Sequence, residues 1–545
     1  MKSLVKYVLG VDFGTDAVRA VLVDDSSGEV LRIKESRYEK WANGDYCVPK
    51  INQYRQHPQD YIDSLINVVS QIKSSCNEEV IENISAISFD TTGSTLAVVD
   101  ENGIPLAMHP EFENNPNAMF ILWKDHTAKK EANDINNLAE KSSVDYLKYS
   151  GGIYSTEWVW SKLLHVLRKD SKVRSRAYSF VEHCDWMPAL LTGKQHPSLI
   201  KRSRCAAGHK AMWHEEWGGF PPAAFFSQLD PVLGEIANNL LPHTYTSDCQ
   251  MGELSREWSD KLGLGTHVKI GVGILDAHAG AIGGGIRQGT LVKVMGTSTC
   301  DILISSKEEL NDKLIQGVCG QVDGAVLPDY IGIEAGQSAY GDIFAWFKDL
   351  LLWPIKKSKG VINMEQFDSD SLLLELSREA QSINVTERDL VATDWLNGRR
   401  TPDANHELKA TITGLDLGIT PPMVFKSLVE AAAYGSRAII DRIKSYGVYI
   451  EEIIAVGGVA KKSPYVIQTL ANVLGLPIKV YLADESCALG SAILATVVSG
   501  KYNTVDQARN QLAVHDYVTF EPEDEKIEIY NVLYEKYRKL GALKV

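Results

Sequence analysis

The sequence predicts an α/β protein built from two related domains. The chain has 545 residues, which suits two domains better than one. Strand-like apolar runs alternate with segments of helical spacing, and glycine is plentiful. Two segments, 8–15 and 292–299, also share a pattern: an apolar strand enters a turn of glycine and hydroxyl residues and continues into a second strand. One such hairpin in each half indicates two related domains.

In the first half, strand and helix signals follow one another. Residues 1–23 read as a β-hairpin, residues 60–72 have helical spacing, and buried strands are expected at 84–89, 96–99 and 268–274. The region 105–260 is mixed and rich in tryptophan, which we interpret mainly as core packing, with one or two rings as an apolar wall for a ligand. The glycines at 283–285 mark the junction between domains 1–284 and 285–545.

The second half contains a β-turn-α-β unit. Thr420 and Pro421 open a long helix that Gly447 can close. A buried strand at 453–456 then leads through Gly457 and Gly458 into a short helix that ends at Gly475, and the next strand is expected at 478–481. A turn that opens a helix is a common way to bind a nucleotide. The tail, about 523–540, predicts a charged amphipathic helix.

Composition excludes several classes of function. The formal net charge of −14 argues against nucleic acid as the main partner, because duplex binding needs clustered lysine and arginine. The eight cysteines form no C-x-x-C pair, and no H-E-x-x-H motif is present, so we expect neither disulfides nor a zinc centre. A reduced, cytoplasmic location fits best. The first apolar run, 4–11, reads as a strand rather than a signal peptide, and we expect no membrane span or membrane partner.

The two hairpins are the first candidates for chemistry. A turn of glycine and hydroxyl residues lets backbone N–H groups approach a polyphosphate closely, so the hairpins at Gly14–Thr15 and Gly296–Thr297 predict a nucleotide between two domains. Asp12 precedes the first turn and could orient a metal-bound water, although aspartate is also common in turns. The chain lacks G-x-x-x-x-G-K-[ST] and the ordered motifs of protein kinases, so ATP would be bound by another fold.

Three further charged residues are candidates with open alternatives. Asp276 ends a buried strand and is placed either to act as a general base or to cap a helix, with even weight on the two. Glu334 follows an apolar strand and is equally explained by a cap or a salt bridge. Lys210 could bind a substrate hydroxyl or a phosphoryl oxygen, but without further information a solvated surface lysine is the better interpretation.

The order of these segments resembles that of the actin/hexokinase/Hsp70-like ATPases, and further blocks are similar to the FGGY family of carbohydrate kinases. The most specific blocks are W-K-D-H-T-A at 123–128 and N-G-R-R-T-P at 397–402. The other matching stretches are 93–95, 110–112, 115–120, 151–155, 205–210, 296–304 and 334–338. The likeness covers nearly the whole chain and weakens at about 355–390 and in the tail.

The resemblance implies two RNase H-like α/β domains with a cleft between them, with ATP mainly on the second domain and sugar mainly on the first. Asp276 matches the catalytic base. The implied substrate-binding residues are Thr95, Trp123, Lys210, Asp276 and Glu334. The implied nucleotide-binding residues are Asp12, Gly14, Thr15, Gly296, Thr297, Gly341, Gly457, Gly458 and Lys462. Asp12 and Asp276 are implied to lie in the outer shell of a Mg²⁺ ion.

Within the family, the chain is most similar to the kinases that use ATP and Mg²⁺ to phosphorylate L-ribulose on its 5-hydroxyl during arabinose catabolism. Two alternatives stay open: a kinase for another pentulose or polyol, such as xylulose or ribitol, and a non-sugar actin-like ATPase. The sequence leaves the oligomeric state open, with a homodimer as one expectation.

Overall fold

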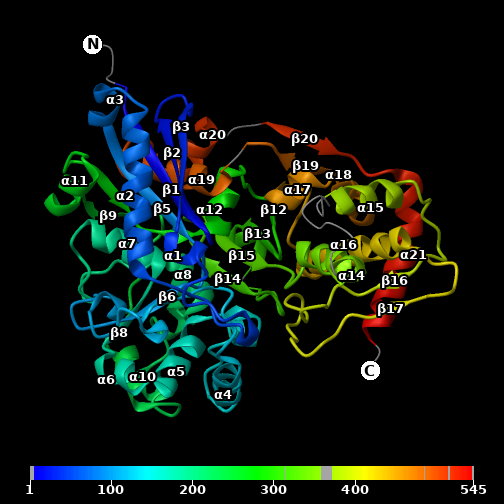
Figure 1. Ribbon diagram of the computed structural model, residues 1–545, viewed down its shortest axis with the longest axis horizontal. Coiled ribbons are helices and arrows are strands. Elements are labelled where there is room, and N and C mark those ends of the chain that lie inside the picture. The colour runs from blue at the N-terminus through cyan, green and yellow to red at the C-terminus, as the bar shows by residue number, and fades with distance from the viewer. Residues whose placement is uncertain (1–4, 312, 358–370, 484, 513–515, 543–545) are drawn as a thin grey trace. The chain divides into compact units, whose positions relative to one another are not determined.

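The computed structural model describes residues 5–311, 313–357, 371–483, 485–512 and 516–542 (Figure 1). The chain forms two compact units. Unit 1 comprises residues 1–285, 320–332 and 484–514, and unit 2 comprises residues 286–319, 333–483 and 515–545. This division differs from a single cut between residues 284 and 285, because two later stretches pack within unit 1.

Unit 1 contains most of the helices and strands. In chain order they are β1 (Tyr7–Phe13), β2 (Ala17–Asp24), β3 (Val30–Arg37), α1 (Glu39–Ala42), β4 (Arg55–Gln56), α2 (Pro58–Ser74), α3 (Glu78–Glu82), β5 (Ile84–Thr91), β6 (Leu96–Val99), β7 (Phe120–Ile121), α4 (Lys129–Ala139), α5 (Val159–Lys169), α6 (Ser171–Arg176), β8 (Ser179–Glu182), α7 (His183–Leu191), α8 (Arg204–Lys210), α9 (Ala223–Phe226), α10 (Pro231–Asn238), β9 (Gln250–Glu253), α11 (Arg256–Leu262), β10 (Lys269–Gly271), β11 (Ile274–Leu275), α12 (Asp276–Gly283), β14 (Gly320–Asp323), α19 (Ser486–Ser499) and α20 (Val505–Leu512).

The main sheet of unit 1 has the strand order β3-β2-β1-β5-β10-β9, with β11 also paired to β5. The first three strands form an antiparallel meander, and β5 then runs parallel to β1, β10 and β11. The single strand expected at 268–274 is thus divided into β10 and β11. A second sheet, β4-β7-β6-β8, lies in the same unit.

Side chains along β1 point alternately to the two faces of the main sheet, and each face packs against a different helix. Leu9, Val11 and Phe13 of β1 belong to one apolar core with Tyr61 and Leu65 of α2. Gly10 points the other way, where a β-carbon would collide with the carbonyl oxygen of Ala488 in α19. The blue strands therefore lie between α2 and the orange helix α19, which comes from the end of the chain (Figure 1).

Unit 2 is built on a sheet with the order β15-β13-β12-β18-β19-β20. Its elements are β12 (Thr290–Met295), β13 (Thr299–Ser305), α13 (Lys307–Leu310), β15 (Ile331–Ala335, from residue 333), α14 (Gly341–Lys356), α15 (Ser371–Gln381), β16 (Val391–Ala392), β17 (Ile412–Thr413), α16 (Pro421–Ser445), β18 (Glu452–Val456), α17 (Gly458–Lys462), α18 (Pro464–Leu474), β19 (Ile478–Tyr481), β20 (Tyr517–Phe520) and α21 (Asp524–Gly541).

The two main sheets repeat one plan. In unit 2, β12 pairs antiparallel with β13 and parallel with β18, as β1 does with β2 and β5 in unit 1. Local signals explain several helix boundaries: Pro421 and Pro464 occupy the first turns of α16 and α18, and Gly475 ends α18 in the left-handed conformation. The predicted α/β class with two related halves is confirmed.

Among the described residues, we find no helix that combines the length and the apolar character needed to cross a bilayer.

Candidate functional site

Three aspartates gather at one edge of the main sheet in unit 1. Asp12 pairs in register with Asp90 on the neighbouring parallel strand, and Ile274 of β11 also lies opposite Asp90. Asp276 follows β11 directly and begins α12. The carboxyl ends of parallel strands meet at the same edge of a sheet, which is where α/β proteins bind ligands. The register therefore places Asp12 and Asp276 at the same edge of the sheet.

The carboxyl groups of Asp12 and Asp90 are buried close together, with oxygens within 4.8 Å of each other, so the two can compete for one proton. Burial, and then repulsion from the Asp12 carboxylate, raises the pKa of Asp90 well above its usual range. Burial also raises the pKa of Asp12, but Arg19, paired with it across β1 and β2, opposes that shift. Asp90 also accepts a hydrogen bond from Ser491 of α19 at 2.6 Å. We infer that Asp90 holds the shared proton and that Asp12 carries the negative charge.

Asp90 is a site residue that is not among the candidates of the sequence analysis. The signal that could have found it is its place at the end of an apolar strand, as with Asp12. Register cannot be derived from one strand considered by itself, since the match between Asp12 and Asp90 depends on the pairing of β1 with β5.

Two substitutions at Asp90 test the shared proton. The amide of Asp90→Asn can donate to Asp12 and accept from Ser491, so we expect a free energy of unfolding within about 1 kcal/mol of the wild type. Asp90→Leu leaves the Asp12 carboxylate and the Ser491 hydroxyl without this partner, so we expect a loss of about 1–3 kcal/mol. Urea unfolding measures both. An equal loss in the two variants would contradict a protonated Asp90.

The first hairpin turn is connected to a predicted sugar-binding residue. The indole Nε1 of Trp123 donates to the hydroxyl of Thr15 at 3.0 Å, and Gln56 Nε2 donates to the carbonyl oxygen of Thr15 at 2.6 Å. Gly14 N donates to the carbonyl oxygen of Ala17 at 3.0 Å and closes the turn. The structure therefore brings together Gly14 and Thr15, predicted for the nucleotide, with Trp123, predicted for the sugar.

Thr95 lies in the turn that follows β5. The turn begins at Thr92, whose backbone N–H donates to the carbonyl oxygen of Phe13, the last residue of β1, at 3.2 Å. The hydroxyls of Thr92 and Thr95 are 2.9 Å apart. This turn is thus held at the same edge of the sheet as the aspartates.

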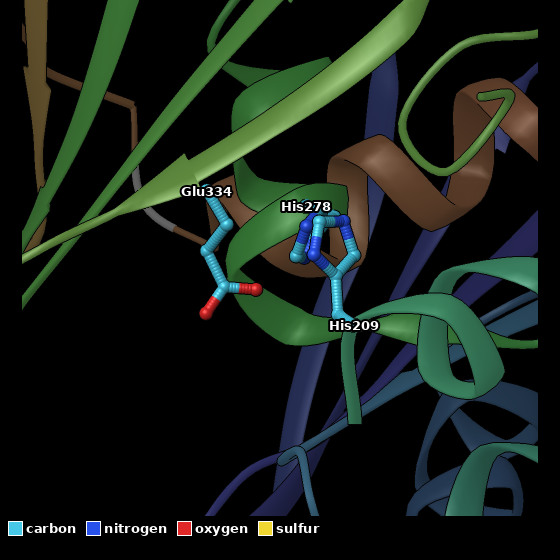
Figure 2. Close-up of side chains that lie close together, drawn as sticks. All are labelled: His209, His278 and Glu334. Carbon is cyan, nitrogen blue, oxygen red and sulfur yellow. The ribbon is translucent and has the colours of Figure 1, made fainter. Parts of the chain in front are cut away.

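Lys210 is buried, with 5 % exposure, so the local expectation of a solvated surface lysine was wrong. It ends α8, and its ammonium lies over the ring of Trp158 at 5.6 Å. Its neighbour His209 contacts His278 of α12, with 4.8 Å between ring centroids (Figure 2). Because His278 is two residues after Asp276, this contact fixes the helix that carries Lys210 next to the helix that carries Asp276.

In unit 2, the second hairpin meets the start of α14. The N–H of Gly341 donates to the carbonyl oxygen of Gly296 at 3.1 Å, and the N–H groups of Tyr340 and Asp342 donate to that of Thr297 at 2.7 and 3.1 Å. A β-carbon at Gly341 would lie 2.6 Å from the Gly296 oxygen, so the close approach requires glycine. Gly296 and Thr297 are themselves exposed.

The Gly457–Gly458 turn lies beside the same hairpin. β18 runs parallel to β12, with Val456 opposite Val294, so Gly457 follows at the same edge as Met295. Gly457 has φ of +100°, and a β-carbon there would lie 2.6 Å from the Met295 oxygen. Lys462 is exposed at the end of α17. The structure thus gathers the predicted glycines of unit 2 around one strand end, and Lys462 ends the short helix that follows.

A buried ion pair supports this second hairpin. Lys293 of β12 faces Asp301 of β13, and its ammonium lies 2.8 and 3.0 Å from the two carboxylate oxygens. The same ammonium reaches Gln337 Oε1 at 3.3 Å, and the N–H of Gln337 donates to the Thr299 hydroxyl at 3.0 Å. The hairpin is therefore anchored by charge as well as by its strand pairing.

Glu334, predicted for the sugar, lies on β15 in unit 2 and is 6 % exposed. It is labelled in the close-up of Figure 2. Its position inside a strand excludes the helix-cap alternative.

Of the donor groups around Asp12, the Asp12 carboxylate is the one that suits Mg²⁺, because Asp90 is assigned the proton and a thiol is a soft ligand. The oxygens of Asp12 and Asp90 and the thiol of Cys487 lie within 4.8 Å of one another. Mg²⁺ prefers oxygen ligands and keeps several waters, so the carboxylate of Asp12, which is the more exposed aspartate of the pair, suits an outer-shell position.

Comparisons with known proteins identify the family to which the chain belongs. The model of the FGGY carbohydrate kinase N-terminal domain matches residues 7–283, and that of the C-terminal domain matches residues 291–499. A ribulokinase of Vibrio parahaemolyticus is 44% identical over 98% of this chain and 95% of its own length. A ribulokinase of Halalkalibacterium halodurans is 34% identical over 98% of this chain and 94% of its own.

Solved structures share the fold. A xylulose kinase of Rhodospirillum rubrum has a TM-score of 0.78 at 20% identity and covers 98% of each chain. A glycerol kinase of Plasmodium falciparum, solved with ADP, has a TM-score of 0.76 at 15% identity and covers 99% of each chain. Both family models and the full-length relatives lead to one conclusion: the chain belongs to the FGGY family of carbohydrate kinases.

Proposed function

We propose that this chain transfers the γ-phosphoryl group of ATP to the 5-hydroxyl of L-ribulose, giving L-ribulose 5-phosphate and ADP in the catabolism of L-arabinose. Relatives named ribulokinase, 44% and 34% identical over 98% of the chain, support the choice of sugar. The scattered cysteines support a cytoplasmic location.

The observation that carries the chemistry is the position of Asp276 at the aspartate edge of unit 1. Asp276 is half-buried at the start of α12, and its Oδ1 accepts the N–H of Ala277 at 2.7 Å, which orients the carboxylate. We assign Asp276 as the general base that takes the proton of the sugar hydroxyl as that oxygen attacks the γ-phosphorus. Thr95, Trp123 and Lys210 in unit 1 and Glu334 in unit 2 are the proposed sugar contacts.

The proposed nucleotide contacts are the two hairpin turns and the glycines of unit 2. Backbone N–H groups at Gly14–Thr15 and Gly296–Thr297 would donate to phosphate oxygens, and Gly341, Gly457 and Gly458 leave room for the nucleotide. Lys462 is the proposed contact at the end of α17. Mg²⁺, when bound through water near Asp12 and Asp276, would neutralise charge on the phosphates.

The test is the release of ADP in a coupled assay with L-ribulose, D-ribulose, xylulose, ribitol or no sugar. We expect the highest kcat/KM with L-ribulose and little ADP without sugar. A higher kcat/KM for xylulose or ribitol would assign a different pentulose or polyol kinase. Equal ADP release with and without sugar would contradict a sugar kinase and favour the actin-like ATPase.

A further inference from the structure

Lys162 of α5 connects the segments that carry two of the proposed sugar contacts. Its side chain is 1 % exposed, and its ammonium donates to the carbonyl oxygen of Ser94 at 2.7 Å and to that of Leu122 at 2.9 Å. These carbonyls belong to the residues immediately before Thr95 and Trp123. One buried cation thus ties two segments that are distant in the sequence.

Glu182, the last residue of β8, holds the same turn through different groups. Its side chain is 2 % exposed. One carboxylate oxygen accepts the N–H of Thr95 at 2.9 Å, and the other accepts the hydroxyl of Ser94. The turn is therefore fixed by three hydrogen bonds, which involve the carbonyl and the hydroxyl of Ser94 and the backbone amide of Thr95.

The surroundings of Lys162 and Glu182 indicate no other role for the two charges. Val159, Leu163 and Val166 of α5 belong to an apolar core, where an apolar side chain at position 162 would avoid the desolvation of a charge. Burial lowers the pKa of Lys162 to about 7 and raises that of Glu182 to about 7, and the charge of each group opposes the shift of the other. Glu157 also favours the Lys162 ammonium, whereas Arg55 and Lys210 oppose it.

We propose that Lys162 and Glu182 are positioning residues for the sugar, which hold Thr95 and Trp123 at the separation that the substrate requires. The inference deepens the proposed function and rests on it. Neither residue is assigned a contact with the sugar, since both act through the backbone next to Thr95 and Trp123.

The central test is Lys162→Met, which keeps a long side chain but removes every N–H donor. The substitution leaves two buried carbonyls without their charged hydrogen-bond donor. We therefore expect KM for L-ribulose to rise about ten- to a hundredfold, with KM for ATP nearly unchanged. Calorimetric titration with L-ribulose in the absence of nucleotide should show the same weakening. Hydrogen exchange at residues 94–96 and 122–123 should become faster.

A double variant tests whether Lys162 positions the sugar contacts or only balances the charge of Glu182. In Lys162→Met/Glu182→Gln, the lone buried carboxylate is gone and the glutamine oxygen can still accept from Thr95, so stability should recover. The Ser94 and Leu122 carbonyls still lack their donor, so KM for L-ribulose should stay raised. A KM that returned to the wild-type value together with stability would overturn the proposal.

The matched control is Lys426→Met in α16 of unit 2, where a buried lysine pairs with Glu430. It should lower stability without raising KM for L-ribulose; an equal rise in both lysine variants would overturn the proposal. If the wild-type protein phosphorylated no sugar, the proposed function would fail, but hydrogen exchange would still decide the inference. Unchanged exchange at residues 94–96 and 122–123 in Lys162→Met would then refute the positioning role.

Discussion

Replacing Asp276 by asparagine is expected to lower kcat for phosphorylation of L-ribulose by about 10²–10⁴-fold, the range that general base catalysis contributes. Asparagine has nearly the same shape and can still accept the N–H of Ala277, which Asp276 accepts at 2.7 Å, so the start of α12 should be kept. It cannot take a proton from the sugar hydroxyl. The loss should therefore appear in kcat, measured by coupled ADP release, with the Kd for L-ribulose nearly unchanged.

Asp63→Asn provides the control, because Asp63 is an exposed aspartate of α2 outside the site and undergoes the same chemical change. It should leave kcat at the wild-type value. A near-normal kcat in Asp276→Asn would show that another group accepts the proton. A loss confined to the Kd for L-ribulose would make Asp276 a binding residue only.

The largest expected effect on stability comes from Lys293→Met. Lys293 and Asp301 are 1 % and 3 % exposed, so the substitution leaves a buried carboxylate without its cation. Breaking a buried pair in this way typically costs about 3–5 kcal/mol. We expect the free energy of unfolding of unit 2 to fall by this amount, as measured by urea denaturation. KM for ATP should also rise, because the pair anchors the hairpin at Gly296–Thr297.

The double variant Lys293→Met/Asp301→Leu should recover most of this stability, because an apolar pair needs no charge compensation. Lys526→Met, which removes the partially exposed pair of Lys526 with Glu523 in the same unit, should change the free energy of unfolding by less than ~1 kcal/mol. If the double variant were as unstable as Lys293→Met, the cost would come from lost packing or from Gln337 rather than from the unpaired charge.

The parts of the fold that depend on short-range signals could be predicted from the sequence. The two hairpins, the strand at 453–456 and the helix between Pro464 and Gly475 each have an apolar pattern bounded by glycine or proline, and the structure has them at these places. Gly296 and Gly457 each follow an apolar strand in the sequence, but their grouping depends on the pairing of β12 with β18.

Features that depend on distant contacts could not be predicted in this way. The burial of Lys210 depends on how α8 packs within unit 1, which its neighbours in the sequence do not show. Lys162 and Lys293 are charged residues in apolar segments, and their partners are carbonyls and carboxylates that only the folded chain brings near. The return of residues 484–514 to unit 1 has the same cause, because Gly10 gives no local sign that Ala488 will pack on it.

That late return of α19 has a consequence for how the protein is made. The ribosome synthesises β1 first and α19 near the end, and at about 5–20 residues per second the interval between them is on the order of tens of seconds. Until then, the face of the sheet at Gly10 has no helix over it and can adhere to other nascent chains. A gene fragment that stops at residue 285 would encode this unfinished face, and its product should aggregate unless a peptide containing residues 485–512 is supplied in trans.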